Sequence, residues 1–425
     1  MLDLKFIVEN PEVVKRACKL KHEPDFVDEI VKQNKLRKEL VARRDNLRKE
    51  LNQISKLISQ LAWEGKDIDD LRDKAKKISD EVKATESELR TVEEKLSELL
   101  LKVPNIPHDS VPIGESEADN KVVKVVGEAP KFDFEPKDHL ALNDKLHLFD
   151  FQLGAKLVGA FFPLFVGDGA KLVRALINFM LDIHTKNGKY IEIYPPALAN
   201  RESMVGTAQL PKLENDMYHL DLEDYFLIPT GEVPLTNLHR DQILREDELP
   251  KYYCAYTPCF RREAGSYGKQ TRGLIRVHQF DKVELVKIVH PQNSFDELED
   301  LLNDAEKVLL ALGLQYRVTL LCTAELTFAS AKTYDIEVWA PGSRKWLEVS
   351  SISNLTDFQA RRMNTRFRPK SGGKPLFVHT LNGSGVALPR LIIALLETYQ
   401  TRDGDILIPD SLKDYFGKDK ICGNN

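Results

Sequence analysis

Cysteine is scarce in this chain, with five residues among 425 at scattered positions. The nearest pair, Cys254 and Cys259, is too widely spaced for a CxxC site, so we expect a reduced, cytoplasmic protein without a structural zinc. No apolar run approaches the ~18 residues that cross a bilayer, and Met1–Lys5 lacks the pattern of a secretory signal, so no membrane is expected among the partners. Neither GxGxxG nor GxxxxGK[ST] occurs, which disfavours Rossmann and P-loop nucleotide binding.

Proline and glycine are also infrequent, at 21 and 22 residues, which excludes a collagen-like or Pro/Gly-rich disordered chain. Hydrophobic residues at 42% and charged residues at 30% are typical of globular domains, and the length predicts two or three of them. The formal net charge of −5, taken as one sum, argues against a broad nucleic-acid-binding surface. The distribution of charge along the chain changes that interpretation.

Residues 27–103 contain no proline and one glycine, and they are rich in Lys, Arg, Glu and Leu, which all favour helices. In their second half, apolar residues recur at alternating steps of three and four from Ile68 onward, with Thr85 as one polar member. This heptad seam and the break at Trp63–Asp67 predict two long helices packed antiparallel, with Asp67 able to cap the second. Each helix would be about 50 Å long at the usual rise per residue.

The two predicted helices differ in charge. Residues 31–60 hold nine Lys or Arg and three acidic residues, a net of +6, whereas residues 66–100 hold eight bases and eleven acids, a net of −3. These charges fit a solvated coiled coil whose opposite charges fix the pairing, and they also fit a basic stripe that binds the phosphates of an extended nucleic acid. The charges alone leave both interpretations open.

A cluster of prolines that begins at Pro104 ends the helical pattern. We therefore expect a helical domain at residues 1–104, a linker at 105–125 and a second domain at 126–425. In the second domain several short β-like segments follow one another directly, which predicts an α+β domain with a mostly antiparallel sheet flanked by helices. The expected strands are 190–194, 225–229, 252–260, 280–289, 316–322, 334–339, 346–353 and 377–382. The expected helices are 170–186, 294–312 and 386–399.

One hairpin of this domain carries chemistry suited to a nucleotide. In strands, residues two apart share a face, so Arg261 and Glu263 would point the same way. The returning strand would present Arg276, His278, Phe280, Lys282 and Glu284 on one face, with Gly265, Gly268 and Gly273 in a flexible loop between the strands. Arginine suits phosphate, an aromatic ring suits the base, and a carboxylate suits an exocyclic amine. A surface hairpin of cross-strand ion pairs is the alternative.

Two later segments are compatible with the same ligand. Glu348-Val349-Ser350-Ser351 ends a strand with a carboxylate and hydroxyls, which are plausible oxygen ligands for Mg²⁺. Gly383–Arg390 leads from a strand into an apolar helix, where glycine permits close approach and a helix start favours anions. A hydrated strand end and an ordinary strand–helix turn are the corresponding alternatives.

Together these segments resemble the class II aminoacyl-tRNA synthetases and, within them, the bacterial-type seryl-tRNA synthetases. The three class motifs occur in order, at Tyr194-Pro195-Pro196, at Arg261–Glu263 with Phe280, and at Gly383–Arg390. Three further stretches resemble the seryl enzyme specifically, namely Thr207–Lys212, Arg276–Glu284 and Phe358–Arg362. The resemblance covers essentially the whole chain and implies an N-terminal antiparallel two-helix coiled-coil arm plus a class II catalytic domain.

The resemblance implies a serine–tRNA ligase that activates L-serine with ATP, with Mg²⁺, and transfers it to tRNA(Ser). Whether tRNA(Sec) is a second substrate is left open. The implied ATP-binding residues are Arg261, Arg262, Glu263, Val277, Phe280, Glu348, Val349, Ser350, Ser351 and Arg390. Of these, Arg261 would hold the α-phosphate, Glu263 the adenine amine and Arg390 the adenine or γ-phosphate, so that Arg261 and Arg390 are the catalytic pair. Phe280 would stack on adenine, and Glu348 and Ser351 would carry Mg²⁺.

The amino-acid and tRNA contacts follow by the same resemblance. The implied serine-binding residues are Thr230, Gly231, Glu232, Arg261, Glu284 and Ser384, with the division between Glu232 and Glu284 left open. The implied tRNA-binding residues are Arg37, Arg43, Arg44 and Arg48 on the arm, and the first motif implies a homodimer. Three positions depart from the family pattern: Gly231 replaces another small residue, Ile352 replaces a frequent cysteine, and Lys189 intrudes where the first motif usually reads Gly-Tyr. The last departure leaves the exact start of that strand open.

Other functions remain to be weighed. A ligase that charges a carrier protein should lack a full tRNA-binding arm, which this chain has. A synthetase for another small amino acid is the other enzymatic alternative. A non-catalytic regulatory or scaffolding relative would be favoured by loss of Arg261, Glu263 or Arg390, and all three are present. The large β-rich body argues against a purely structural coiled-coil protein.

Overall fold

The computed structural model describes residues 1–264 and 272–423, and its contacts divide the chain into two compact units, Leu2–Pro104 and Asn105–Asn425 together with Met1. Gly265 and Gly268, expected in the hairpin loop, lie outside the described residues. No helix within the described ranges is long and apolar enough to span a bilayer. The 105–125 linker remains a prediction, and the first side chain of that range, Asn105, is buried with its amide donating to the carbonyls of Ala329 and Leu355.

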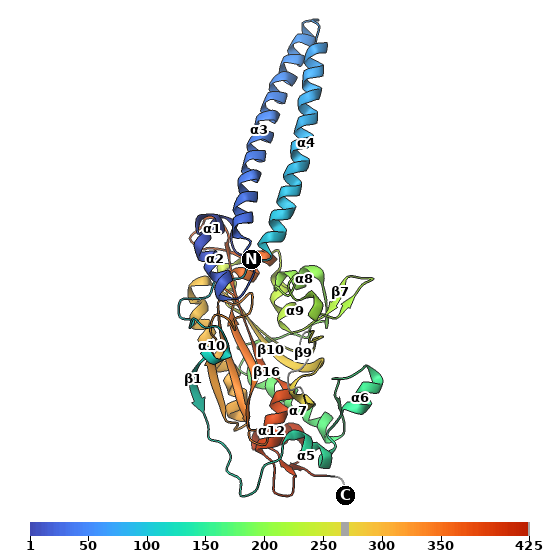
Figure 1. The fold of residues 1–425 in the computed structure, drawn as a ribbon, viewed down its shortest axis with the longest axis vertical. Helices are drawn as coiled ribbons and strands as arrows, with labels where there is room; N and C mark the ends of the chain where they lie inside the picture. Colours follow the sequence, from blue (N-terminus) through green and yellow to red (C-terminus); the bar gives the residue numbers. More distant parts are fainter. Residues whose placement is uncertain (265–271, 424–425) are drawn as a thin grey trace. The chain divides into compact units, whose positions relative to one another are not determined.

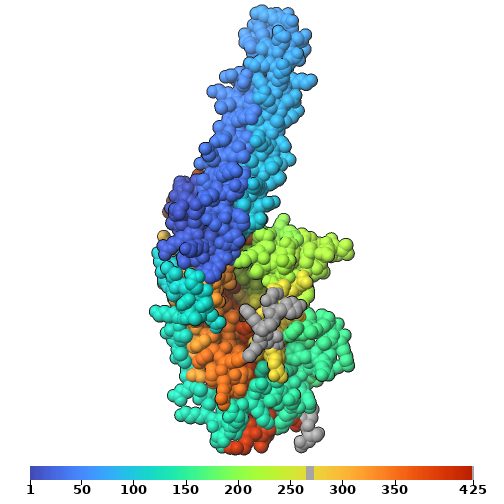
Figure 2. All heavy atoms as spheres, in the orientation of Figure 1, coloured from blue at the N-terminus to red at the C-terminus, as the bar shows by residue number. Residues whose placement is uncertain are grey.

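The first unit contains two short helices, α1 (Leu4–Glu9) and α2 (Pro11–Leu20), and two long ones, α3 (Val27–Trp63) and α4 (Asp69–Leu100). Figure 1 shows α3 and α4 as a helical hairpin, and Figure 2 shows their side chains in contact along its length. From Ile78 to Leu99 the apolar seam of α4 is buried as the heptad pattern predicts, whereas Leu71 and Ala75 are partly buried. Thr85 within the seam donates its hydroxyl to the carbonyl of Glu81. The N-cap of α4 is Ile68, which makes no side-chain capping bond, and not Asp67 as expected. Asp67 lies one residue earlier, and its carboxylate accepts the N–H of Asp69, the first residue of the helix.

Ion pairs between the two long helices confirm their antiparallel direction. The pairs are Lys95–Glu29, Arg37–Glu93, Arg48–Glu86 and Lys74–Glu50. As the residue number rises along α3, that of the partner on α4 falls, which only antiparallel packing allows. Leu40 and Ile54 are buried against α4, and Leu36, Val41, Leu47, Leu51 and Ile58 are partly buried there. Val27 and Ile30 at the beginning of α3 are fully buried, whereas Leu57 and Trp63 are exposed.

The second unit is built on an eight-stranded sheet in the order β1-β11-β12-β13-β16-β10-β9-β4. All neighbouring strands are antiparallel except β4 and β9, which are parallel. The strands are β1 (Lys121–Val126), β4 (Ile191–Glu192), β9 (Lys251–Phe260), β10 (Gln279–Val289), β11 (Tyr316–Leu320), β12 (Lys332–Ala340), β13 (Lys345–Asn354) and β16 (His379–Ala387). The expected α+β architecture with a mostly antiparallel sheet is therefore confirmed.

Helices cover this sheet. The main core joins it to α7 (Asp168–Thr185), α10 (Ser294–Ala311) and α12 (Leu388–Thr398). The remaining helices are α5 (His139–Leu146), α6 (Phe151–Leu157), α8 (Arg201–Gly206), α9 (Glu232–Thr236), α11 (Phe358–Met363) and α13 (Asp410–Phe416). Short strands complete the unit: β2 (Phe149–Asp150), β3 (Leu164–Phe165), β5 (Leu198–Asn200), β6 (His219–Leu220), β7 (Tyr225–Leu227), β8 (Ile243–Arg245), β14 (Arg366–Arg368), β15 (Leu376–Phe377), β17 (Ile406–Leu407) and β18 (Lys420–Ile421).

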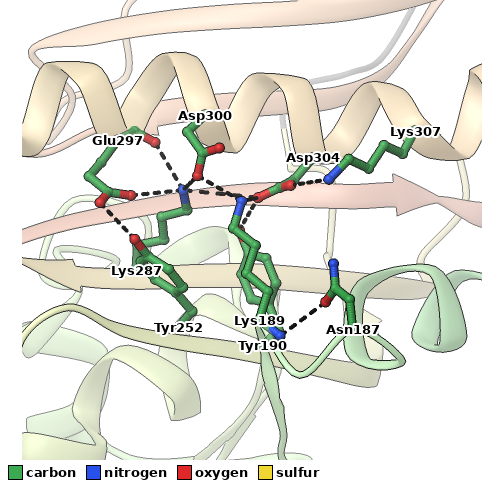
Figure 3. Close-up of polar contacts among 9 residues, drawn as sticks. All are labelled: Asn187, Lys189, Tyr190, Tyr252, Lys287, Glu297, Asp300, Asp304 and Lys307. Carbon is green, nitrogen blue, oxygen red and sulfur yellow. Dashed lines mark hydrogen bonds and ion pairs between the residues drawn. The ribbon is translucent and has the colours of Figure 1, made fainter.

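The first strand expected from the sequence, 190–194, is shorter in the structure, where only Ile191–Glu192 pairs as β4. Lys189 lies just before it, and its ammonium contacts Asp300 at 2.7 Å and Asp304 at 2.6 Å on α10. Figure 3 shows these three residues within a larger polar network that also contains Lys287 of β10. The departure at Lys189 thus ties the beginning of the edge strand to a helix that packs on the sheet.

Candidate active site

Four of the six predicted serine-binding residues form a buried polar cluster, which is called the serine pocket below. Thr230, Glu232, Glu284 and Ser384 are each less than one-tenth exposed. Glu284 on β10 lies directly opposite Ser384 on β16, and the hydroxyl of Thr230 is 3.4 Å from the carboxylate of Glu284. The structure therefore brings together side chains separated by more than a hundred residues in the sequence.

Lys282 belongs to this pocket, although no role was assigned to it from the sequence. It is 5% exposed, and its ammonium donates to the hydroxyl of Thr230 at 2.7 Å and forms an ion pair with Glu284. Because residues two apart on a strand share a face, the sequence did place Lys282 beside Glu284. A buried carboxylate of this kind requires a paired cation, and Lys282 supplies one.

Glu232 is buried at the start of α9. Burial, together with the negative charge of Glu284, raises the pKa of Glu232 to about 7, although Gln359, Lys282 and Arg261 oppose the shift. The carboxyl group is therefore balanced between its neutral and ionised forms near neutral pH.

Gly231 leaves room for the neighbouring carboxylate. A Cβ atom added there would lie 2.9 Å from the Cβ of Glu284, closer than real side chains approach. Glycine at this position thus allows the loop that carries Thr230 to pack directly against β10.

Arg261 lies beside the pocket and next to an aromatic ring. Its Nε donates to the carbonyl of Pro229 at 3.3 Å, and its guanidinium lies over the ring of Phe280, 5.2 Å from the centroid. One difference from the sequence-based picture is that β9 ends at Phe260, so Arg261 and Glu263 are not on a strand and the alternation rule does not apply to them. Arg276 and His278 likewise precede β10, whereas Phe280, Lys282 and Glu284 lie on it.

Glu263 is held in a turn rather than in a strand. Its backbone has a φ of 52°, in the left-handed region, and its carboxylate lies 3.0 Å from the guanidinium of Arg276. The side chain of the neighbouring Arg262 is exposed, while its backbone N–H donates to the carbonyl of Asp216. Val277 is buried on the returning segment.

Arg390 is the second residue after the start of α12, and it points back toward β13. Its guanidinium donates to the carbonyl of Glu348 at 2.8 Å and lies 3.3 Å from that residue's carboxylate. Its Nε also donates to the carbonyl of Ile275 at 3.2 Å, which ties it to the returning half of the hairpin. The third motif is therefore in direct contact with the segment that leads into β10.

The candidate magnesium ligands lie on β13, where Val349 and Ser350 are buried and Glu348 is exposed. Asp335 on β12 is paired with Ser351 in the strand register and was not predicted from the sequence. Burial, and then the charge of Glu348, hold the pKa of Asp335 well above its usual range, and its Oδ1 has no hydrogen-bond partner within the described residues. Two carboxylates and a hydroxyl, one oxygen unsatisfied, fit a hard cation.

Within residues 1–264 and 272–423, no group of three or more His, Cys, Asp or Glu side chains is arranged to hold a metal ion. A magnesium ion here would therefore need oxygen atoms from its substrate as well, which is its usual mode of binding in sites that handle nucleoside triphosphates.

A buried histidine supports the base of the hairpin loop. The Nε2 of His139 accepts the N–H of Leu274, and its Nδ1 contacts the fully buried carboxylate of Glu397. Gly273 has a φ of +68°, and a Cβ there would lie 2.2 Å from that same Nε2. Glu397 and Arg390 share α12, so this contact links the helix that carries Arg390 to the loop residues before β10.

The four predicted tRNA-binding arginines lie along α3 but differ in their surroundings. Arg37 and Arg48 pair with Glu93 and Glu86 of α4, and Arg44 pairs with its neighbour Asp45. Arg43 is exposed. The inter-helix pairing that was expected from charge is therefore present for two of the four.

The sheet, the hairpin and the Arg390 helix together define a class II synthetase catalytic core. Residues 216–399 match the family model described as the tRNA synthetase class II core domain (G, H, P, S and T), and residues 1–107 match the seryl-tRNA synthetase N-terminal domain. A serine–tRNA ligase of Geobacter sulfurreducens is 51% identical over 98% of this chain and 99% of its own, and one of Carboxydothermus hydrogenoformans is 49% identical over 99% of each.

The crystal structure of the Pyrococcus horikoshii seryl-tRNA synthetase complexed with ATP superposes with a TM-score of 0.94 at 36% identity, covering 100% of both chains. The chain belongs to the seryl-tRNA synthetase family.

Proposed function

We propose that the pocket and the arginines described above carry out the two steps of serine–tRNA ligation. The chain is an ATP-dependent serine–tRNA ligase: the carboxylate of L-serine attacks the α-phosphate of ATP, pyrophosphate leaves, and a terminal ribose hydroxyl of tRNA then takes the seryl group. The observation that carries this assignment is the buried pocket of Thr230, Glu232, Lys282 and Glu284 beside Arg261 and Phe280. It offers acceptors for a small, hydrogen-bonding amino acid next to groups suited to a nucleotide.

In this proposal each residue type has a physical task. Arg261 neutralises the α-phosphate and reaches the serine carboxylate, Phe280 stacks on adenine, and Glu263 accepts its exocyclic amine. The guanidinium of Arg390 lies 3.3 Å from the carboxylate of Glu348, so both side chains could contact one bound nucleotide. Catalysis then consists mainly of positioning and charge neutralisation, without a covalent enzyme intermediate.

Magnesium would be held by Glu348 and Ser351, with Asp335 beside them. When bound, the ion would neutralise phosphate charge and orient the leaving pyrophosphate. The unsatisfied oxygen of Asp335 supports this placement because an ion or its water ligands would satisfy it.

Serine selectivity would follow from the burial and polarity of the cluster. An amino acid without a hydroxyl would leave buried acceptors unpaired, and a larger side chain would meet the packed wall at Gly231 and Glu284. The basic face of α3 would bind the phosphate backbone of tRNA(Ser) through Arg37, Arg43, Arg44 and Arg48. Charging of tRNA(Sec) by the same route is part of the proposal.

A homodimer and a cytoplasmic location complete the proposal. The edge strand β4 exposes Ile191 at 59%, and Tyr194 just after it is 88% exposed. Leu157 and Val158 are 72% and 68% exposed at the end of α6. Exposed apolar residues of this size favour burial against a second copy of the chain. Sedimentation that gave only monomers at micromolar concentration would contradict the dimer.

The test of the function is ATP–pyrophosphate exchange with each of the twenty amino acids. Strong exchange with serine alone is expected. Exchange with no amino acid, or strongest exchange with another one, would overturn the assignment.

A further inference from the structure

Gln359 makes a set of hydrogen bonds that converges on the serine pocket. It lies on the short helix α11, is 1% exposed, and is 127 residues from Glu232 in the sequence. Its Nε2 donates to the carboxylate of Glu232 at 2.6 Å and to the carbonyl of Thr207 at 3.2 Å. Its Oε1 accepts the hydroxyl of Thr380 at 2.7 Å. Both ends of the amide are therefore fully used inside the protein.

These partners determine which way the amide faces. The carbonyl of Thr207 can only accept, so the nitrogen of Gln359 must face it. A flipped amide would place its oxygen against both that carbonyl and the carboxylate of Glu232, which is repulsive. Thr380 stabilises the same orientation from the other end. Gln359 is thus fixed as a donor toward Glu232.

The state of Glu232 depends on four neighbours. Glu284 on β10 repels its negative charge, whereas Lys282 on the same strand and Arg261 after β9 attract it. Gln359 on α11 donates a hydrogen bond to it. Desolvation and Glu284 favour the neutral form of Glu232, and the other three groups favour the ionised form that can accept from an amino-acid substrate.

We propose that Gln359 is a positioning residue for the ligase reaction: held by Thr380, it keeps Glu232 ionised and oriented to accept a hydrogen bond from serine. The inference rests on the proposed function, because it assumes that Glu232 contacts the amino acid. The inference also gives a function to the Phe358–Arg362 stretch, to which nucleotide binding assigned none.

The test is the pH dependence of kcat/KM for serine in pyrophosphate exchange by the full chain, from about pH 6 to about pH 8.5, because this quantity reports ionisations of the free enzyme. The wild type should lose activity on the acid side with a midpoint near 7, the pKa of Glu232. Gln359→Met, which keeps the length but cannot donate, should move this midpoint upward by about one pH unit. Its kcat at saturating serine and high pH should stay near that of the wild type.

Gln400→Met is the matched control. Gln400 is also buried, at 5% exposure, and makes three hydrogen bonds to the backbone at Lys137 and Glu397, away from the pocket. It should lower the melting temperature without moving the pH midpoint. Equal losses for the two variants at every pH would reduce Gln359 to a structural role and overturn the proposal.

Thr380→Val provides a second route if Gln359→Met folds poorly. Without the hydroxyl the amide loses its anchor, so the midpoint should move in the same direction by a smaller amount. An unmoved midpoint in Thr380→Val or Gln359→Met, with normal wild-type exchange, would overturn the role of Gln359 and leave the ligase assignment intact. Absence of serine-dependent exchange in the wild type would instead overturn the proposed function and this inference with it.

Discussion

Arg390 and Glu348 are paired with each other, at 2.8 Å through the backbone carbonyl and 3.3 Å through the carboxylate. The cation proposed to meet ATP and the anion proposed to hold magnesium therefore neutralise one another in the protein alone. A magnesium–nucleotide complex offers each of them a partner of opposite charge. If these proposed roles hold, nucleotide binding would exchange the partners of Arg390 and Glu348 rather than insert new charge.

Arg390→Gln should reduce serine-dependent pyrophosphate exchange by about 100-fold, because one charge-stabilising donor to the reacting phosphates is typically worth that much. Arg390→Lys should recover little, since a lysine cannot form the same planar fork of hydrogen bonds. Arg402→Gln is the matched control, as Arg402 is an exposed arginine paired with Asp133. Near-normal exchange in Arg390→Gln would contradict the placement.

The arm should separate tRNA charging from amino-acid activation. Arg43→Ala, at an exposed position on α3, should weaken serylation of tRNA several-fold and lower its salt sensitivity, because one phosphate contact is lost. Pyrophosphate exchange should be unchanged. Substitution of Arg37, Arg44 or Arg48 by alanine should act in the same direction, and equal loss of both activities would contradict the separation of roles.

The ion pairs on the arm offer a sharper comparison. Glu93→Gln and Glu86→Gln remove the partners of Arg37 and Arg48 while leaving both arginines in place. If these arginines bind phosphate, tRNA serylation should be maintained or improved in the glutamine variants. If they serve only to pair the helices, the glutamine and arginine variants should lose thermal stability alike and charge tRNA alike.

Lys287 should contribute strongly to stability. It is fully buried, its ammonium lies 2.9 Å from Glu297 and 2.6 Å from Asp300, and it lies over the ring of Tyr252 (Figure 3). Lys287→Met should lower the free energy of unfolding by about 3 kcal/mol, because it leaves partly buried acids uncompensated. Lys189→Met, at a more exposed ammonium, should cost less. Since Asp300 serves both lysines, the double variant should deviate from additivity in urea unfolding.

His379 should make folding sensitive to mild acid. Burial lowers the pKa of His379 to about 4, whereas an unfolded histidine titrates near 6.5. Between these values only the unfolded chain binds the proton, so the stability of the wild type falls as the pH drops through this range. His379→Asn can keep the contact with Ser294 but lacks the titration. Its stability deficit should therefore shrink by about 1.4 kcal/mol per pH unit from pH 6.5 downward in urea titrations. A constant deficit would contradict this.

Periodic features were predictable from the sequence. The heptad seam of α4 and the turn after Trp63 occur where the pattern placed them, whereas the N-cap of α4 is one residue later than expected, at Ile68. The period-two pattern also placed Phe280, Lys282 and Glu284 on one strand, β10. In each case the signal is local, because burial of one face imposes its own spacing on neighbouring residues.

Side-chain contacts between segments that are distant in the sequence were not predictable. Glu232 meets Gln359, and Asp335 meets Ser351, through folding that brings distant segments together. An ion pair such as Arg276–Glu263 was open as the alternative for the hairpin, but its geometry was not predicted, because the strand ends at Phe260 and the alternation assumed for Glu263 does not apply. The roles of Lys282 and Gln359 could not be assigned from residue spacing, because they depend on which groups the ammonium and the amide contact in the folded chain.

Gly273 has a left-handed backbone, and a Cβ atom added there would lie 2.2 Å from the imidazole of His139. These two facts have an evolutionary consequence. Every other residue would have to displace His139, and with it the contact to Glu397. Replacement of His139 by a smaller residue would relieve the collision but leave the unfavourable φ. Any residue other than glycine at position 273 would therefore suffer both the collision and the unfavourable φ. Saturation mutagenesis with selection for growth should recover glycine alone at codon 273.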